Sequence, residues 1–153
     1  MELVGVWSGG RELEERLSAR LGQRFSFFTG SHPADFTQRG PALLVIAPDA
    51  TGLAGAGLIR PRVALLPGDS VALLSRVRAT SAVSYGLGRR NTLTLSSMEG
   101  GSVAVALQRE LMTLSGAGVE RQEWVLPYDR QRESPEEFLC LVGALLLLDQ
   151  PLG

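Results

Sequence analysis

The sequence contains no lysine, and all 15 of its basic side chains belong to arginine. The chain therefore cannot provide a phosphate-binding P-loop lysine, a Schiff-base lysine or a lysine general base. Cysteine and histidine occur once each, at Cys140 and His32. These two residues are too few for a disulfide, a cysteine-based zinc site or a histidine pair on a metal. Several common kinds of chemistry are thus excluded, and Cys140, which lies in an apolar run, is expected to be an inert core thiol.

Excess charge and long apolar runs are also absent. The 15 basic and 16 acidic residues leave a net charge of -1, which gives no long-range attraction for a phosphate backbone, so we expect no nucleic-acid partner. The longest apolar run, residues 138–148, is shorter than the roughly 20 residues that a helix needs to span a bilayer. The N-terminus lacks the basic region and long apolar segment of a signal peptide. We expect a cytoplasmic protein with no membrane partner.

Length and composition predict one folded domain. A chain of 153 residues is long enough to bury roughly two-thirds of its unfolded surface. Its hydrophobic fraction of 44% and charged fraction of 20% are those of ordinary globular proteins. We therefore treat residues 1–153 as a single domain.

The first 87 residues alternate between strand-like and helix-like segments. Strands are expected at residues 3–7, 25–28, 42–47, 63–66 and 81–85. Helical segments are expected at residues 11–21, where leucines recur every four positions, in a turn at residues 35–39, and from residue 69 or 70 to about 78. Such alternation is typical of a mostly parallel sheet with helices on both faces. The predicted fold class is α/β and Rossmann-like.

Beyond residue 87 the pattern changes to antiparallel strands. Their expected positions are residues 92–95, 102–108, 110–115 and 123–126. Ser134, Pro135 and Glu137 then form a strong helix start, because serine caps, proline suits the first helical position and glutamate completes a capping box. The helix over residues 135–148 is apolar nearly all round. We expect it to be central in the core, or to bury one face against a partner.

Ligands of a parallel α/β sheet lie beyond the carboxyl ends of its strands. The residues predicted to bind a small-molecule or nucleotide-like ligand there are Ser8, Gly9, Gly10, Asp49, Asp69, Ser70 and Tyr85. Residues 8–10 precede a helix and can offer backbone N–H groups to an anion, although a plain strand-to-helix turn has the same sequence. No cofactor is expected.

Two groups of charged residues have alternative interpretations. Asp49 and Asp69 would share Mg²⁺ or act as acid and base if their strands are neighbours, as in a small hydrolase or transferase. Aspartate before a helix is also a preferred cap, which is the simpler role for Asp69. Residues 89–91, Arg-Arg-Asn, are either a clamp for phosphate or carboxylate or a solvated turn. A serine triad through His32 has no GxSxG context.

The stretch over residues 62–148 resembles the later part of the central domain of the Mur ligases, the ATP-dependent peptidoglycan-precursor ligases. In that family a buried strand ends in an Asn-Ala-Asp-Asp type of turn, and a short helix follows. The next strand ends in Tyr/Phe-Gly-Leu before antiparallel strands and an alanine-rich helix. Here the turn reads Pro-Gly-Asp-Ser at residues 67–70, the later strand ends in Tyr-Gly-Leu at residues 85–87, and the last helix contains Gly-Ala-Leu at residues 143–145.

The sequence also departs from the Mur ligase pattern. Pro67 and Ser70 stand where the family has asparagine and the second aspartate, whereas Asp69 matches the first aspartate. No His-Asn pair follows Leu126, and the Gly-Lys-Thr/Ser loop and the carbamylated lysine are absent. The resemblance implies a bacterial-type domain that has lost ATP-dependent ligation and in which Asp69 meets a ribose-like hydroxyl. The predicted function is a non-catalytic domain that binds a small ligand or a protein partner, with a homo-oligomeric scaffold as an alternative.

Overall fold

The computed structural model describes residues 2–21, 24–37, 40–50, 58–69 and 77–152. The strands of its first half are β1 (Glu2–Trp7), β2 (Phe25–Gly30), β3 (Leu43–Ile46), β4 (Val63–Pro67) and β5 (Ser81–Tyr85). Those of the second half are β6 (Leu93–Glu99), β7 (Ser102–Leu107), β8 (Leu111–Met112), β9 (Gly118–Val119) and β10 (Gln122–Pro127). The helices are α1 (Glu12–Leu21), α2 (Ala34–Thr37) and α3 (Pro135–Leu147).

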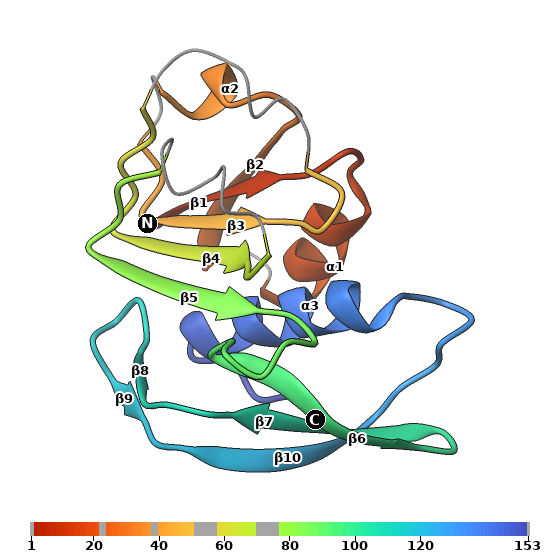
Figure 1. The fold of residues 1–153 in the computed structure, drawn as a ribbon. Helices are drawn as coiled ribbons and strands as arrows, with labels where there is room; N and C mark the ends of the chain where they lie inside the picture. Colours follow the sequence, from red (N-terminus) through yellow and green to blue (C-terminus); the bar gives the residue numbers. More distant parts are fainter. Residues whose placement is uncertain (1, 22–23, 38–39, 51–57, 70–76, 153) are drawn as a thin grey trace.

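Eight of the described strands form one sheet in the order β10-β7-β6-β5-β4-β3-β1-β2 (Figure 1). The pairs from β2 through β1, β3, β4 and β5 to β6 are parallel, and the pairs from β6 through β7 to β10 are antiparallel. The prediction of a mostly parallel α/β sheet with an antiparallel C-terminal extension is confirmed. None of the described helices is both long enough and apolar enough to cross a membrane.

Two predicted elements differ from the structure. Of the strand expected over residues 110–115, only β8 is extended, and it pairs with β9 outside the main sheet. The chain turns back soon afterwards at Gly116, whose φ of +94° suits glycine. The helix expected to end near Arg78 does not reach that residue, because Val77 forms a parallel bridge with Ile59 and the Arg78 N–H donates to the Ile59 carbonyl at 2.8 Å. Residues 70–76 of that helix lie outside the described residues.

The central position predicted for the last helix is confirmed. Its first turn has the expected capping box: the Glu137 N–H donates to the Ser134 hydroxyl and the Ser134 N–H to the Glu137 carboxylate, both at 3.1 Å. Every side chain from residue 138 to 148 is buried.

The sheet itself explains this burial. One side of α3 packs on β3, β4, β5 and β6, α1 contacts it as well, and side chains of β7 and β10 belong to the same hydrophobic cluster. Figure 1 shows α3 between β5 on one side and β7 and β10 on the other, so the sheet curls around the helix. The apolar surface of α3 is therefore used within the chain and offers no exposed face to a second copy.

Candidate ligand-binding edge

The reversal in strand order beside β1 defines where a ligand is expected. The chain passes from β1 to β2 on one side and returns to place β3 on the other, as in the doubly wound order 2-1-3-4-5. Ligands bind such sheets at this switch point, outside the carboxyl ends of the two strands. The Ser8 N–H donates to the Gly30 carbonyl at 3.1 Å, and the Ala47 N–H donates to the Trp7 carbonyl at 2.9 Å. These bonds align the carboxyl ends of β1, β2 and β3 at one edge.

The structure brings together the predicted residues that follow β1 and β3. A Cβ atom added to Gly9 would lie 2.7 Å from the Asp49 carboxylate, so the absence of a side chain at residue 9 lets the aspartate approach the turn. Ser8 is only 4% exposed, and its hydroxyl donates to the Gly10 carbonyl. Residues 8–10 and Asp49 therefore form one local arrangement.

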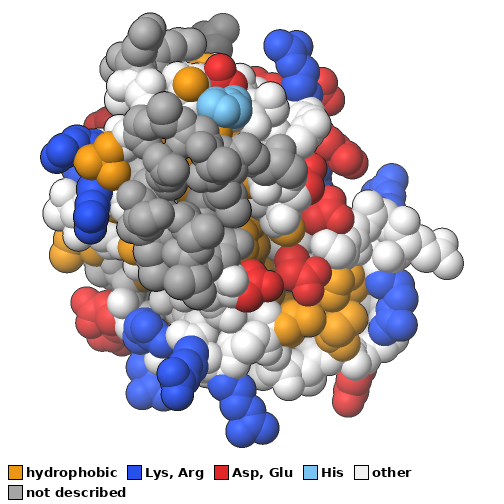
Figure 2. All heavy atoms as spheres, turned by 45° about the horizontal axis from the view of Figure 1, so that its top comes forward, with side chains coloured by type: hydrophobic (Ala, Val, Ile, Leu, Met, Phe, Trp, Pro, Cys, Tyr) orange, Lys and Arg blue, Asp and Glu red, His pale blue; other side chains and the backbone are white. Residues whose placement is uncertain are grey.

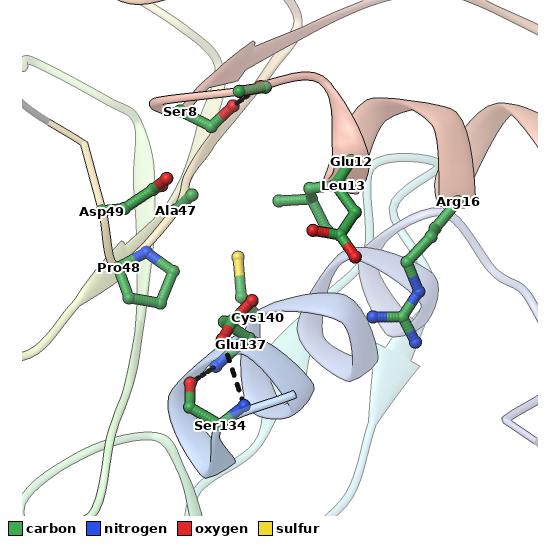
Figure 3. A pocket seen from close by; sticks show the side chains of 11 residues that line it. Ser8, Glu12, Leu13, Arg16, Ala47, Pro48, Asp49, Ser134, Glu137 and Cys140 are labelled. Carbon is green, nitrogen blue, oxygen red and sulfur yellow. Dashed lines mark hydrogen bonds between the residues drawn. The ribbon is translucent and has the colours of Figure 1, made fainter. Parts of the chain in front are cut away.

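A pocket of about 350 Å³ lies at this position (Figure 3). We call it the switch-point pocket. Its lining comes from the turn after β1, the N-terminal halves of α1 and α3, and the turn after β3: Ser8, Gly10, Glu12, Leu13, Arg16, Ala47, Pro48, Asp49, Ser134, Glu137 and Cys140. It combines apolar walls with hydroxyl, carboxylate and backbone groups, the usual make-up of a small-molecule site.

Acidic side chains dominate the switch-point pocket. Glu12, Asp49 and Glu137 line it, and Arg16, the one basic residue among its described lining residues, pairs with Glu133 at 2.7 Å. Glutamates in the first turns of α1 and α3 already balance the positive ends of these helices. The pocket therefore suits an uncharged, hydroxyl-rich or amine-bearing group better than a phosphate.

A second pocket of about 630 Å³ lies at the ends of β4 and β5. We call it the loop pocket, because residues 86–91 form much of its wall. Its lining is Pro48, Pro67, Gly68, Asp69, Tyr85, Gly86, Leu87, Gly88, Arg89, Arg90, Asn91 and Glu136. Pro48 also lines the switch-point pocket, so the two pockets adjoin. Asp49 and Asp69 line different pockets, which gives no support to a shared metal or an acid and base pair.

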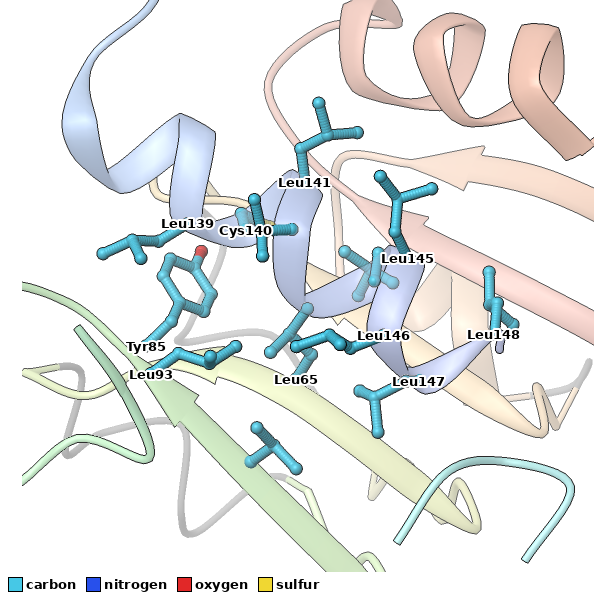
Figure 4. Close-up of a cluster of buried hydrophobic side chains, with 14 of the residues drawn as sticks. Leu65, Tyr85, Leu93, Leu139, Cys140, Leu141, Leu145, Leu146, Leu147 and Leu148 are labelled. Carbon is cyan, nitrogen blue, oxygen red and sulfur yellow. The ribbon is translucent and has the colours of Figure 1, made fainter. Parts of the chain in front are cut away.

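Tyr85 is used mainly within the core. It is 1% exposed, and its hydroxyl donates to the Ile46 carbonyl at 2.5 Å. Figure 4 places its ring among the leucines of α3 and beside Cys140. Burial raises the pKa of the Tyr85 hydroxyl far above its ordinary value. The side chain therefore fixes the end of β5 against β3, and the end of that strand forms part of the loop pocket.

Asn91 has a structural role that its sequence context does not reveal. It is 9% exposed and fills the space between two glycine turns, since a Cβ on Gly68 would lie 1.6 Å from its Oδ1 and a Cβ on Gly86 would lie 2.9 Å from its Nδ2. Its Nδ2 donates to the Gly88 carbonyl at 2.9 Å. The only sequence signal is the group of glycines at the ends of two strands.

His32 is separate from the residues that line these pockets. Ser70 lies outside the described residues. His32 is exposed, and its Nδ1 accepts from the Ala34 N–H at 3.1 Å. Because the Ser8 hydroxyl is bonded to Gly10, these contacts do not assemble a serine and histidine pair. Among the described residues, no group of three or more histidine, cysteine, aspartate or glutamate side chains could hold a metal ion.

Cys140 leads to a prediction about alkaline solution. Burial raises the pKa of its thiol from 9.0 to about 12. Between these values the unfolded chain releases the thiol proton and the folded chain keeps it, so stability is complete below about pH 9 and falls by about 1.4 kcal/mol per pH unit above it. Urea unfolding across this range measures the slope. Cys140→Ala should reduce it between about pH 9 and 10, where Tyr85 and Tyr128, whose pKa values burial also raises, contribute less; an unchanged slope would contradict the assignment.

Comparisons of the sequence with models of known protein families and with curated proteins found no match. The fold defines an α/β domain of doubly wound strand order with two adjoining pockets at its carboxyl edge. The Mur ligase resemblance therefore depends only on the order of elements and the short motifs of residues 62–148.

Proposed function

We propose that this chain is a non-catalytic domain that binds a small polar ligand at the carboxyl edge of its parallel strands. The proposal is based on the switch-point pocket, a cavity of about 350 Å³ that is lined by Ser8, Asp49 and the N-terminal halves of α1 and α3. The position is the one at which doubly wound sheets bind ligands. A cavity of this size suits a small molecule better than a protein partner.

The state of the reactive side chains supports binding over catalysis. Burial raises the pKa of the Cys140 thiol to about 12, which disfavours the nucleophilic thiolate. The Tyr85 hydroxyl is bonded within the core. Asp69 and Asp49 line separate pockets. These states favour a binding domain over an enzyme. The loss of ATP-dependent ligation is what the Mur ligase resemblance implies, because the chain has no lysine for a phosphate-binding loop.

Charge indicates which part of a ligand the switch-point pocket would take. Its carboxylates accept hydrogen bonds from hydroxyl and amine groups and repel anions. Figure 2 shows several basic side chains gathered near the lower edge of one face and acidic side chains nearer the centre, with further side chains of both signs around the rim. A ligand with an uncharged or amine-bearing portion fits this arrangement.

The proposal is tested by thermal shift of the full chain against nucleosides, nucleotides and UDP-sugar peptides. At least one compound should raise the melting temperature. Asp49→Asn should weaken binding of that compound about tenfold, because a hydrogen bond to a charged group contributes about 1.5–3 kcal/mol. The matched control is Asp149→Asn, an exposed aspartate at φ +59° that asparagine tolerates. A panel without any stabilising compound, or equal affinities for the two variants, would refute the proposal.

A further inference from the structure

The loop over residues 86–91 is held through its carbonyl groups by the end of β7. The Gln108 side-chain amide donates to the Arg89 carbonyl at 2.8 Å and to the Asn91 carbonyl at 2.7 Å. The Arg109 guanidinium donates to the Arg90 carbonyl. Three consecutive carbonyl groups are thus bonded by two side chains that lie outside the loop.

Asn91 completes this set of bonds. Its side-chain and backbone N–H groups both donate to the Gly88 carbonyl, at 2.9 and 3.2 Å. The Gly86 N–H donates to the Leu93 carbonyl at 3.1 Å, which ties the loop to the start of β6. These bonds order the loop without a ligand, so binding would not carry the entropy cost of ordering it.

The donors of the same loop are available to a ligand. Within the described part of the chain, no hydrogen bond uses the backbone N–H groups of residues 87–90. Arg89 and Arg90 are exposed, line the loop pocket and form no ion pair with another described residue. Arg16 and Arg62, in contrast, each pair with a glutamate.

We propose that the loop pocket binds the phosphoryl group of a phosphorylated small molecule. The guanidinium groups of Arg89 and Arg90 match phosphate oxygens with two N–H donors each. The backbone N–H groups of residues 87–90, which donate to no described acceptor, add further donors in the same loop. Asp69 and Glu136 line the same pocket, and because carboxylates accept hydrogen bonds from hydroxyl groups, they suit the sugar or alcohol part of such a ligand, while the arginines take its phosphoryl group. This inference rests on the proposed function and names the charged part of its ligand.

The test is an NMR titration of the ¹⁵N-labelled full chain with ribose 5-phosphate, with ribose as the uncharged comparison. Ribose 5-phosphate should shift the amide signals of residues 87–90 and bind at least about tenfold more tightly than ribose, since each charge-assisted bond contributes about 1.5–3 kcal/mol. The Arg89→Gln/Arg90→Gln double variant should lose about tenfold or more of this affinity. The control is Arg130→Gln/Arg132→Gln, which removes two exposed arginines outside both pockets.

Other results would overturn the phosphoryl assignment alone or the proposed function as well. Unshifted amide signals in residues 87–90, or a double variant that binds ribose 5-phosphate like the control, would overturn the phosphoryl assignment. Acetate that produces the same shifts with equal affinity would assign the loop to carboxylates and overturn it as well. If uncharged nucleosides bind in an Asp49-dependent way while ribose 5-phosphate does not bind, only this inference fails. If no compound of the thermal-shift panel binds either, the proposed function fails with it.

Discussion

Replacing Leu139 with alanine is expected to lower the free energy of unfolding by about 2–5 kcal/mol, the usual cost of truncating a buried leucine. Leu139 is 0% exposed and lies on α3 in the main hydrophobic cluster. Figure 4 shows its side chain beside the ring of Tyr85. A domain of this size has a total stability of about 5–15 kcal/mol, so the variant should lose a large fraction of it.

Urea unfolding measures this loss, and Leu87→Ala provides the same chemical change at an exposed position. Leu87 is 53% exposed on the loop after β5, so its truncation should change stability by less than about 0.5 kcal/mol. Comparable effects of the two substitutions would contradict an enclosed α3. Alanine has a higher intrinsic helix propensity than leucine, so a loss of stability in Leu139→Ala reports burial of the side chain and not weaker helix formation.

Leu139 illustrates what can be predicted from local sequence. An apolar pattern that covers all sides of residues 138–148 predicts a helix with no wet face, and the capping box predicts where it starts. The pattern does not predict which elements cover it. That depends on the pairing of β7 and β10 and on the curl of the sheet around α3, which are contacts between residues far apart in the chain.

Some features of the candidate site can likewise be predicted from local sequence, and others depend on long-range contacts. Strand ends are local features, so the sequence placed Ser8, Asp49, Asp69 and Tyr85 near one edge. Strand order is not a local feature, and it decides that Asp49 lies with Ser8 across β1 and β3, in a different pocket from Asp69. The sequence points to Asn91 only as part of the candidate clamp of residues 89–91. Its packing role depends on the close approach of Gly68, which belongs to another strand end, and local sequence does not predict it.

This approach leads to the second prediction: Gly68→Ala should destabilise the chain by about 1–3 kcal/mol, the cost of leaving a buried polar group without its hydrogen bond. The Gly68 N–H donates to the Tyr85 carbonyl at 2.9 Å, which holds the turn in place. An added Cβ would lie 1.6 Å from the Asn91 Oδ1. The asparagine must then move and lose its hydrogen bond to the Gly88 carbonyl. This loss loosens the loop over residues 86–91, which lines the loop pocket.

A double-mutant cycle with Asn91→Ala isolates this contact. Once the asparagine amide is removed, the alanine at position 68 has room, so Gly68→Ala should cost at least about 1 kcal/mol less in the Asn91→Ala background. Gly40→Ala is the control, because no atom lies within 4 Å of its added Cβ, and it should be neutral or stabilise by about 0.4–1 kcal/mol. Additive effects of the two substitutions would mean that Asn91 does not restrict residue 68. Two results together would show that this contact connects the turn after β4 to the loop over residues 86–91. One is a clear coupling energy, and the other is that ribose 5-phosphate no longer shifts the amide signals of that loop in the Gly68→Ala variant.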